Sequence, residues 1–243
     1  MTWSIIARDP ATGKFAIAVA TRFFAVGALV PYLQAGVGAV ATQALVNPFY
    51  GPRGLALLSE QAPPADAVAA LIAADEGRDH RQLHLMDWSG RSAAHTGSAC
   101  IGWCGSCGGE GFSLAGNMLV GPNVLDDTAA AYAANAGLPF PRRLIAAMRA
   151  GEAAGGDKRG KQSAALLIYG EEEWSELDLR VDDQAEPLAE LARLEQVSCE
   201  RWIHFRKFLP SRRDPVGITD RNVIEAGIAA ALAGEAARHE APR

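Results

Sequence analysis

Two β-forming segments joined by a short turn begin the chain, and this pattern constrains the fold more than any other feature. Residues 2–8 and 14–20 are rich in β-forming residues. Residues 9–13 between them read Asp-Pro-Ala-Thr-Gly. In such a turn Asp bonds to its own backbone, Pro fixes φ, and Gly accepts a positive φ. The sequence therefore predicts a β-hairpin whose open end carries Thr2.

Thr2 follows Met1 directly. Removal of Met1 would leave a hydroxyl and a free α-amine on one residue at the end of a rigid strand. An α-amine has a reference pKa of about 7.7–8.0, so it acts as a base near neutral pH while lysine side chains stay charged. This arrangement predicts a hydrolase in which Thr2 supplies both the nucleophile and the base. The competing interpretation is an ordinary strand residue, since a short pattern such as Met-Thr is not specific.

The rest of the chain alternates between groups of strands and groups of helices. Glycine-rich or turn-rich loops are expected at 47–54, 96–111 and 151–161, and helices at 55–59, 64–74, 126–135, 141–150, from 187 through 194, and 221–236. Further strands are expected at 36–43, 81–86, 91–95, 112–115, 162–169 and 174–181. This order favours an α+β layered domain with mostly antiparallel sheets. We expect one domain over residues 1–185 and a helical C-terminal extension over 186–243.

Charge and composition exclude several classes of partner. The formal net charge of −5 gives no basis for a nucleic-acid or membrane-surface partner. No apolar run is long enough to span a bilayer, and a hairpin from residue 2 leaves no room for a signal peptide. We therefore expect a cytoplasmic protein. Four cysteines in 243 residues do not form the pattern of a disulfide framework.

Seven segments, taken in order, resemble one known family. They are residues 2–9, 20–27, 38–43, 50–54, 95–100, 115–119 and 155–166. Together they are similar to the family catalogued as domain of unknown function 1028, which is placed among the N-terminal-nucleophile hydrolases. The resemblance covers roughly residues 2–185. It implies a four-layer αββα sandwich and, by analogy with the superfamily, hydrolysis of an amide bond.

The candidate catalytic residues are Thr2, Arg22, Asn117 and Asp157. Thr2 would attack a carbonyl, and Asn117 would donate to the oxyanion, although an Asn beside Gly also forms turns. Arg22 ends the second hairpin strand close to Thr2 and would shape the site together with Asp157; a surface ion pair is the alternative for Arg22. Candidate substrate-binding residues are Thr21, Gln43, His95, Arg159 and Ser163.

Alternatives remain open for two of these groups. His95 at a strand end is either a general base, a positioning donor or a hydrogen-bonded structural residue. The charged loop that contains Asp157 and Arg159 is either a solvated cluster or a functional loop ahead of a buried strand, binding a substrate carboxylate or orienting Thr2.

Two motif-like patterns do not indicate a cofactor. Cys100, Cys104 and Cys107 have the spacing of an iron–sulfur site, but no repeated strand–helix units precede them and no fourth ligand is evident. Glycines at 36 and 38 imitate a dinucleotide fingerprint, yet they lie inside an apolar strand and no helix follows. We expect no metal and no cofactor. The basic, aromatic segment 201–213 favours an amphipathic helix packed on the domain or on a partner subunit.

Taken together, these features predict an amidohydrolase that cleaves a small amide or peptide-like bond through an acyl ester on Thr2, within a homo-oligomer. The alternative is a non-catalytic ligand-binding or assembly protein on the same fold.

Overall fold

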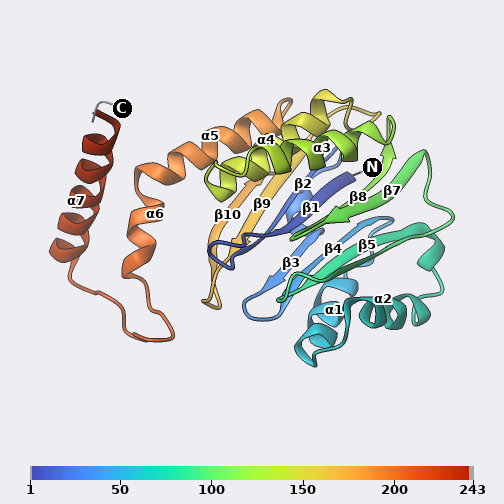
Figure 1. The fold of residues 1–243 in the computed structure, drawn as a ribbon, viewed down its shortest axis with the longest axis horizontal. Helices are drawn as coiled ribbons and strands as arrows, with labels where there is room; N and C mark the ends of the chain where they lie inside the picture. The colour runs from blue at the N-terminus through green and yellow to red at the C-terminus, as the bar shows by residue number, and fades with distance from the viewer. Residues whose placement is uncertain (1, 241–243) are drawn as a thin grey trace. The chain divides into compact units, whose positions relative to one another are not determined.

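Two antiparallel β-sheets form the body of the protein in the computed structural model, which describes residues 2–240 (Figure 1). The larger sheet has six strands and the smaller has four. In spatial order the larger sheet contains β10 (Ser175–Val181), β9 (Ser163–Tyr169), β2 (Phe15–Thr21), β1 (Thr2–Arg8), β8 (Phe112–Leu119) and β7 (Trp103–Gly109). The smaller sheet contains β3 (Pro31–Gln34), β4 (Gly38–Ala44), β5 (Arg81–Asp87) and β6 (Ser92–Thr96).

The N-terminal hairpin forms the centre of the larger sheet. β1 pairs with β2 from Thr2 opposite Thr21 to Arg8 opposite Phe15, and its other edge pairs with β8. The turn closes as its chemistry predicts, because Gly13 has a φ of 71° and its N–H donates to Asp9 O at 2.8 Å. A central strand is held on both edges, so the position of Thr2 is fixed by two ladders.

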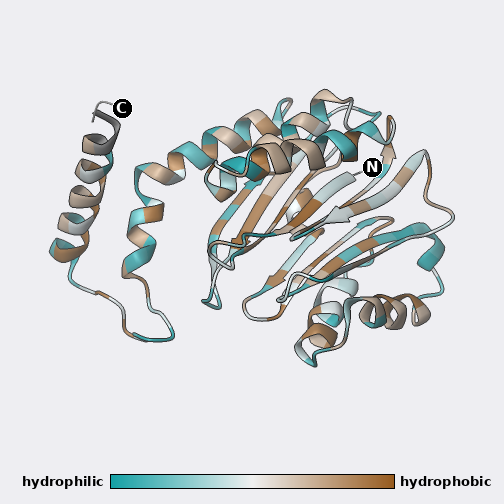
Figure 2. Ribbon diagram, viewed as in Figure 1, coloured by the Kyte–Doolittle hydropathy of each residue, from teal (hydrophilic) through white to brown (hydrophobic). Residues whose placement is uncertain are grey.

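Helices cover the outer faces of both sheets (Figure 1). α1 (Tyr50–Ser59) and α2 (Pro64–Ala73) pack on the smaller sheet through a buried cluster that includes Val40 and Leu85. α3 (Asn123–Ala134) and α4 (Phe140–Ala153) lie over the larger sheet. Hydrophobic residues recur along the strands of both sheets (Figure 2). Such a mixed α+β arrangement buries each sheet on its two faces.

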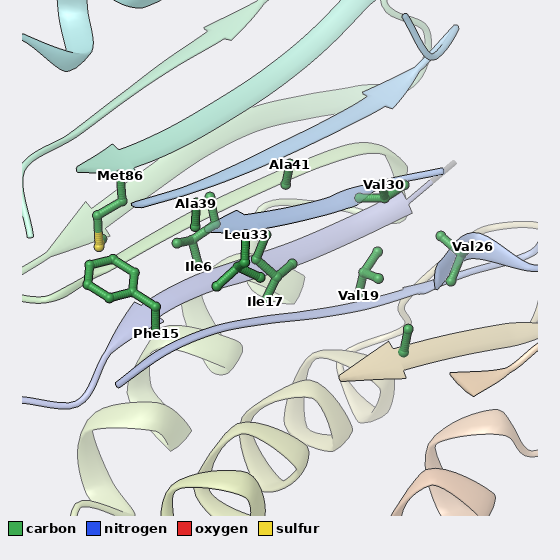
Figure 3. Close-up of a cluster of buried hydrophobic side chains, with 11 residues drawn as sticks. Ile6, Phe15, Ile17, Val19, Val26, Val30, Leu33, Ala39, Ala41 and Met86 are labelled. Atoms are coloured by element: carbon green, nitrogen blue, oxygen red, sulfur yellow. The ribbon is translucent and has the colours of Figure 1, made fainter. Parts of the chain in front are cut away.

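The inner faces of the two sheets pack against one another. Figure 3 shows this cluster, with Phe15 and Met86 at one end and Val26 and Val30 at the other. Phe15, Ile17 and Val19 alternate along β2 and are fully buried, as a period of two requires for an inward face. Interdigitated side chains from both sheets thus make the core.

Two compact units divide the chain, one reaching to Ala192 and the other starting at Arg193. The boundary lies inside α5 (Pro187–Glu200). The second unit contains α6 (Trp202–Phe205) and α7 (Arg221–Glu240), with Ile224 and Ile228 buried on α7.

Four elements differ from those the sequence predicts. β7 occupies part of the expected glycine-rich loop, because an edge strand needs only backbone pairing, here with β8. α1 begins at Tyr50, inside the expected turn at 47–54. β3 was not predicted, since it is four residues long and starts with Pro31. The expected amphipathic helix over 201–213 is only α6 followed by a single 3-10 turn at Arg206–Phe208.

Candidate active site

Three polar residues from three adjacent strands meet at one end of the larger sheet. Thr2 on β1 is the register partner of Thr21 on β2 and of Asn117 on β8. Alternation puts Thr2 on the same strand face as Ser4 and Ile6, and Ile6 belongs to the core between the sheets. The three side chains therefore lie side by side on the inner face of the sheet.

The Thr2 hydroxyl is buried and hydrogen-bonded within this row. Thr2 Oγ1 donates to Thr21 Oγ1 at 3.1 Å, and Asn117 Nδ2 donates to Thr2 O at 3.4 Å. The exposed fractions are 7% for Thr2, 2% for Thr21 and 1% for Asn117. A hydroxyl held this way has a defined direction, which a nucleophile requires.

All three residues line a cavity of about 550 Å³, a volume typical of small-molecule sites. The cavity lies at the end of the inter-sheet core marked by Val26 and Val30 in Figure 3. Its walls are mostly apolar. The apolar lining residues are Phe23, Val26, Leu29, Val30, Ala44, Leu45, Val46, Ala99, Ile101 and Met118.

Unusual backbone conformations are concentrated around this cavity. Ala44 and Met118, which line it, have φ values of 69° and 55°, and Ala25, next to Val26, has a φ of 52°. Only Gln61 shares a left-handed φ among the other non-glycine residues that the structure describes. Such conformations cost free energy for residues with a Cβ and cluster at functional sites. Their location supports a role for the cavity beyond packing.

A fully buried amide network orients Asn117. Gln82 Nε2 donates to the carbonyl oxygens of Gly105 and Gly116 at 3.1 and 2.9 Å, so this end of the side chain must be the nitrogen. Gln82 Oε1 then accepts from Asn117 Nδ2 at 3.0 Å and from Gln43 Nε2 at 2.8 Å. The amide hydrogens of Asn117 are therefore directed at Gln82 and at the Thr2 carbonyl.

The same network fixes the tautomer of His84. Ser4 Oγ donates its one proton to Gln43 Oε1 at 2.8 Å, so His84 Nε2 must donate to Ser4 Oγ, also at 2.8 Å. His84 Nδ1 is then the acceptor of the Ser113 hydroxyl at 3.0 Å. Burial lowers the pKa of His84 to about 3, so the ring is neutral at neutral pH.

Asn117 therefore lies beside Thr2, but its N–H groups are already engaged. Its Oδ1 atom is buried and has no hydrogen-bond partner. This arrangement does not support the expected oxyanion role, because the amide hydrogens of Asn117 are directed at Gln82 and at the Thr2 carbonyl. Asn117 instead holds the Thr2 carbonyl and connects the cavity to the network.

Asp157 and Ser163 fasten the segment that follows β2. Asp157 Oδ2 accepts from Arg22 N at 2.8 Å, and Val26 N donates to Ser163 Oγ at 3.1 Å. Ser163 Oγ in turn donates to Phe23 O at 2.6 Å. Neither Asp157 nor Ser163 lines the cavity, so each acts through the backbone that carries Phe23 and Val26 to its wall.

Two predicted residues have side chains that are directed elsewhere. The Arg22 side chain is exposed, and its guanidinium donates to Gln162 Oε1 at 3.1 Å rather than entering the cavity. His95 contacts Arg78 O through Nε2 at 3.0 Å, also outside the cavity lining. The catalytic role predicted for the Arg22 side chain and the substrate-binding role predicted for His95 are thus not supported by their positions. Gln43 is fully buried and outside the cavity lining; its Nε2 donates to Thr2 O at 3.5 Å and to Gln82 Oε1 at 2.8 Å.

Arg159 does line the cavity. It donates to Asp157 through its backbone N–H at 2.7 Å and through its guanidinium at 3.2 Å. The Asp157 carboxylate therefore holds the positively charged guanidinium group of Arg159 in place.

Several polar residues of this region were not among the predicted site residues. His80 and Cys100 line the cavity, while Gln82 and His84 form the network. The signal for the last two was alternation along β5, where polar residues at 82 and 84 recur on one face. Such a face ordinarily indicates solvent, whereas here it meets the polar residues of the other sheet.

The site contains no arrangement that favours a metal. Among the side chains that the structure describes, no three from His, Cys, Asp or Glu lie close enough together to hold a metal ion. Cys100, Cys104 and Cys107 are not in disulfides, and burial, followed by the neighbouring Cys104, raises the pKa of the Cys100 thiol. Also among the described residues, the helices are all too short or too polar to cross a membrane.

Comparison with known proteins identifies the family. The model of a family of unknown function, DUF1028, matches residues 2–191. The chain belongs to this family. A DUF1028 crystal structure, protein SPO2555 from Silicibacter pomeroyi, is 34% identical, with a TM-score of 0.84 over 90% of this chain and 99% of that chain. No curated protein sequence matches the chain.

Two more distant structures belong to Anbu, the ancestral beta-subunit. Anbu from Yersinia bercovieri is 12% identical with a TM-score of 0.43, over 81% of this chain and 94% of that chain. The Gly-1 mutant of Anbu from Hyphomicrobium sp. strain MC1 is 11% identical with the same score, over 82% and 94%. TM-scores this low do not support any conclusion about the chemistry of this DUF1028 protein.

Proposed function

We propose that this DUF1028 protein is an amidohydrolase on a four-layer αββα sandwich of the N-terminal-nucleophile type. Thr2 Oγ1 is the nucleophile and, once Thr2 is the first residue, its α-amine is the base. The observation that carries the proposal is the position of the Thr2 hydroxyl, which lies on a central strand and lines the cavity of about 550 Å³.

Residues around Thr2 would orient the nucleophile, stabilise the transition state and support the cavity wall. Thr21 Oγ1 accepts the Thr2 proton at 3.1 Å in the resting state and so holds the nucleophile in one direction. Arg159 is the cation of the cavity lining and would stabilise negative charge on the carbonyl oxygen in the transition state. Asn117 holds the Thr2 backbone, and Asp157 and Ser163 hold the cavity wall.

The proposed step is an acyl transfer. Thr2 Oγ1 forms a bond to the carbonyl carbon, its proton passes through the α-amine to the leaving nitrogen, and the carbon–nitrogen bond breaks. Water then attacks the resulting ester, which releases a carboxylic acid and restores the hydroxyl. Because both steps use the same amine, the rate should depend on its deprotonated fraction.

Substitution of the hydroxyl tests this function. Thr2→Val replaces the hydroxyl by a methyl group of similar shape, and Thr2→Ser keeps the hydroxyl. With protein whose first residue is verified by intact mass spectrometry, a covalent amide-directed probe should label the wild type and Thr2→Ser but not Thr2→Val. Cys100→Ser is the matched control, because Cys100 is another nucleophile in the lining. Unchanged labelling of Thr2→Val would overturn the proposal.

A ligand-binding protein without catalysis is the second candidate. It is favoured by one observation: the cavity lining among the described residues contains no carboxylate that could act as a base. Under this alternative, Met1 stays in place in the protein from its natural host and Thr2 serves only as a polar contact. Assembly as a homo-oligomer is proposed as well, and light scattering of the purified protein tests it.

A further inference from the structure

The cavity beside Thr2 has a row of polar side chains on the larger sheet, and most of the rest of its lining is apolar. Thr2, Thr21 and Asn117 are adjacent in sheet register, so the polar groups of the larger sheet are gathered together. Ten of the sixteen lining residues are aliphatic, aromatic or methionine. If the carbonyl carbon of a substrate lies at Thr2 Oγ1, the group attached to that carbon would therefore contact apolar side chains.

Large apolar side chains in this lining are also open to solvent. Phe23, Leu45 and Ile101 are 56%, 62% and 63% exposed, and each lines the cavity. They come from three separate segments: the loop after β2, the loop after β4 and the loop before β7. Exposed apolar residues gathered around a cavity indicate a site where an apolar ligand removes their surface from water.

The charges of the lining disfavour a cation. Arg159 carries the one permanent charge among the described lining residues, and no Asp or Glu is part of that lining. An ammonium group taken into this cavity would lose its water without gaining a carboxylate partner. The part of the ligand that enters the cavity is therefore expected to carry no positive charge.

From these three observations we propose that the substrate class is an amide whose acyl group is an apolar chain without an ammonium group. This assignment rests on the proposed function. It adds that the acyl side of the amide is bound, and that the apolar wall of the cavity binds it. The acyl chain lies along the wall of Val26, Val30 and Ile101 while its carbonyl carbon meets Thr2 Oγ1.

The chain remains in the cavity through both chemical steps. When the carbon–nitrogen bond breaks, the amine departs with its proton and the acyl chain stays attached to Thr2 as an ester. Water then cleaves that ester and releases the carboxylic acid. Binding of the apolar chain is therefore shared by substrate and acyl intermediate, so it raises affinity more than it raises the rate of the chemical step.

Binding to the Thr2→Val protein tests the substrate class without any catalysis. Titration calorimetry with acetamide, butyramide, hexanamide and octanamide should give affinities that rise about three- to fourfold per methylene until the cavity is filled. The ω-amino analogue of octanamide should bind at least tenfold more weakly than octanamide. Affinity independent of chain length, or equal affinity of the amino analogue, would overturn the assignment.

Two variants of exposed residues locate the chain. Ile101→Asn changes a lining residue and Val120→Asn changes one outside the lining that is 46% exposed, so neither is expected to disturb folding. Octanamide should bind Ile101→Asn at least fourfold more weakly, while its affinity for Val120→Asn stays unchanged. Equal effects of the two variants would place the chain elsewhere and overturn the proposal.

Footprinting gives an independent readout. Octanamide should slow the alkylation of Cys100, which lines the cavity, while Cys104, which does not, serves as the internal control. Failure of the two proposals is distinguishable. If Thr2→Val binds long amides and the wild type hydrolyses none, the function fails and the binding site stands. If the wild type hydrolyses acetyl amides with no gain from a longer chain, the function stands and the substrate class fails.

Discussion

The layer between the two sheets is filled at one end and hollow at the other. At the filled end Phe15 stacks on Trp88 with ring centroids 4.8 Å apart, and Met86 completes the packing. At the hollow end the same strand β2 ends in Thr21, which lines the cavity. The inward residues of β2 become smaller from Phe15 to Thr21, so the difference in residue volume along one strand decides where the cavity lies.

A buried polar network also lies on the inner faces of the two sheets. It differs from the apolar packing at the filled end and from the cavity at the hollow end. Ser4, Gln43, Gln82, His84 and Ser113 are joined by hydrogen bonds whose donors and acceptors all have one consistent assignment. A network of this kind specifies how the two sheets align, since a shift of one residue would leave buried amides unpaired. Apolar volume at the filled end thus contributes to stability alone, whereas the network contributes to stability and also sets the register of the two sheets.

The largest effect is expected where the filled end loses volume. Phe15→Ala should lower the free energy of unfolding by about 3–5 kcal/mol, because a fully buried ring is replaced by a cavity. Phe23→Ala at the hollow end should change it by less than about 0.5 kcal/mol, since that ring is largely exposed. Urea denaturation of the two variants measures the contrast. Similar midpoints would mean that the two ends do not differ in packing.

Breaking the network should have the next largest effect. Gln82→Met removes the acceptor shared by Gln43 and Asn117, and each unsatisfied buried amide costs about 1–3 kcal/mol, so a loss of about 3 kcal/mol is expected. Gln184→Met, at an exposed position, should stay within about 0.5 kcal/mol of the wild type. A neutral result for Gln82→Met would show that the network adds nothing to stability.

The network should also make stability depend on pH. Burial lowers the pKa of His84 to about 3 from 6.5, so the unfolded chain takes up a proton at His84 that the folded chain refuses. The contribution is complete above pH 6.5 and declines as the pH falls toward 3. Between pH 7.5 and pH 5 the free energy of unfolding should fall by about 2 kcal/mol through this group.

Two comparisons isolate the histidine. His84→Gln keeps a donor toward Ser4 and should reduce the loss over this pH range, whereas His80→Gln, at an exposed histidine, should not. The carboxyl groups of Asp75 and Asp87 have a pKa lowered below 3.8, against their burial, by hydrogen bonds from side chains and backbone. Their contribution is lost only at more acidic pH. An unchanged pH dependence in His84→Gln would contradict the assignment.

The smallest effect concerns the segment that forms one wall of the cavity. Ser163→Ala removes the acceptor of the Val26 N–H and the donor to Phe23 O, and should cost about 1 kcal/mol. Hydrogen exchange at Val26 should become faster than in the wild type. Ser59→Ala, which removes an exposed hydroxyl bond on α1, is the control. Unaltered exchange at Val26 would mean that Ser163 does not hold the wall.

Short-range chemistry accounts for the features that the sequence predicts well. The hairpin of β1 and β2 follows from its turn residues and its apolar strands, and the pairing of Thr2 with Thr21 follows from that hairpin. Asn117 was identified from its side-chain amide within a segment that resembles the family, but its place next to Thr2 depends on β8 pairing with β1 more than a hundred residues away. β7 escaped detection because glycines carry no side-chain pattern.

The roles of the polar residues could not be derived from the local sequence. A serine at position 4 or a histidine at 84 has the same local preferences whether it faces solvent or another sheet. Whether Asn117 donates to an oxyanion or to Gln82 depends on which atoms lie within about 3 Å, and those atoms belong to strands distant in sequence. The direct catalytic role expected of the Arg22 side chain was not supported either, because the direction of that side chain also depends on a residue distant in sequence, Gln162.

The sequence by itself determined the family, the N-terminal hairpin and the location of Thr2 at its open end, because turn chemistry and alternation act over a few residues. Only the tertiary structure decided that Thr2 lines a cavity with apolar walls, that Asn117 is directed at Gln82, and that His84 is buried and neutral. Those outcomes depend on which strands become neighbours and how the two sheets face each other, and these depend on packing across the whole domain.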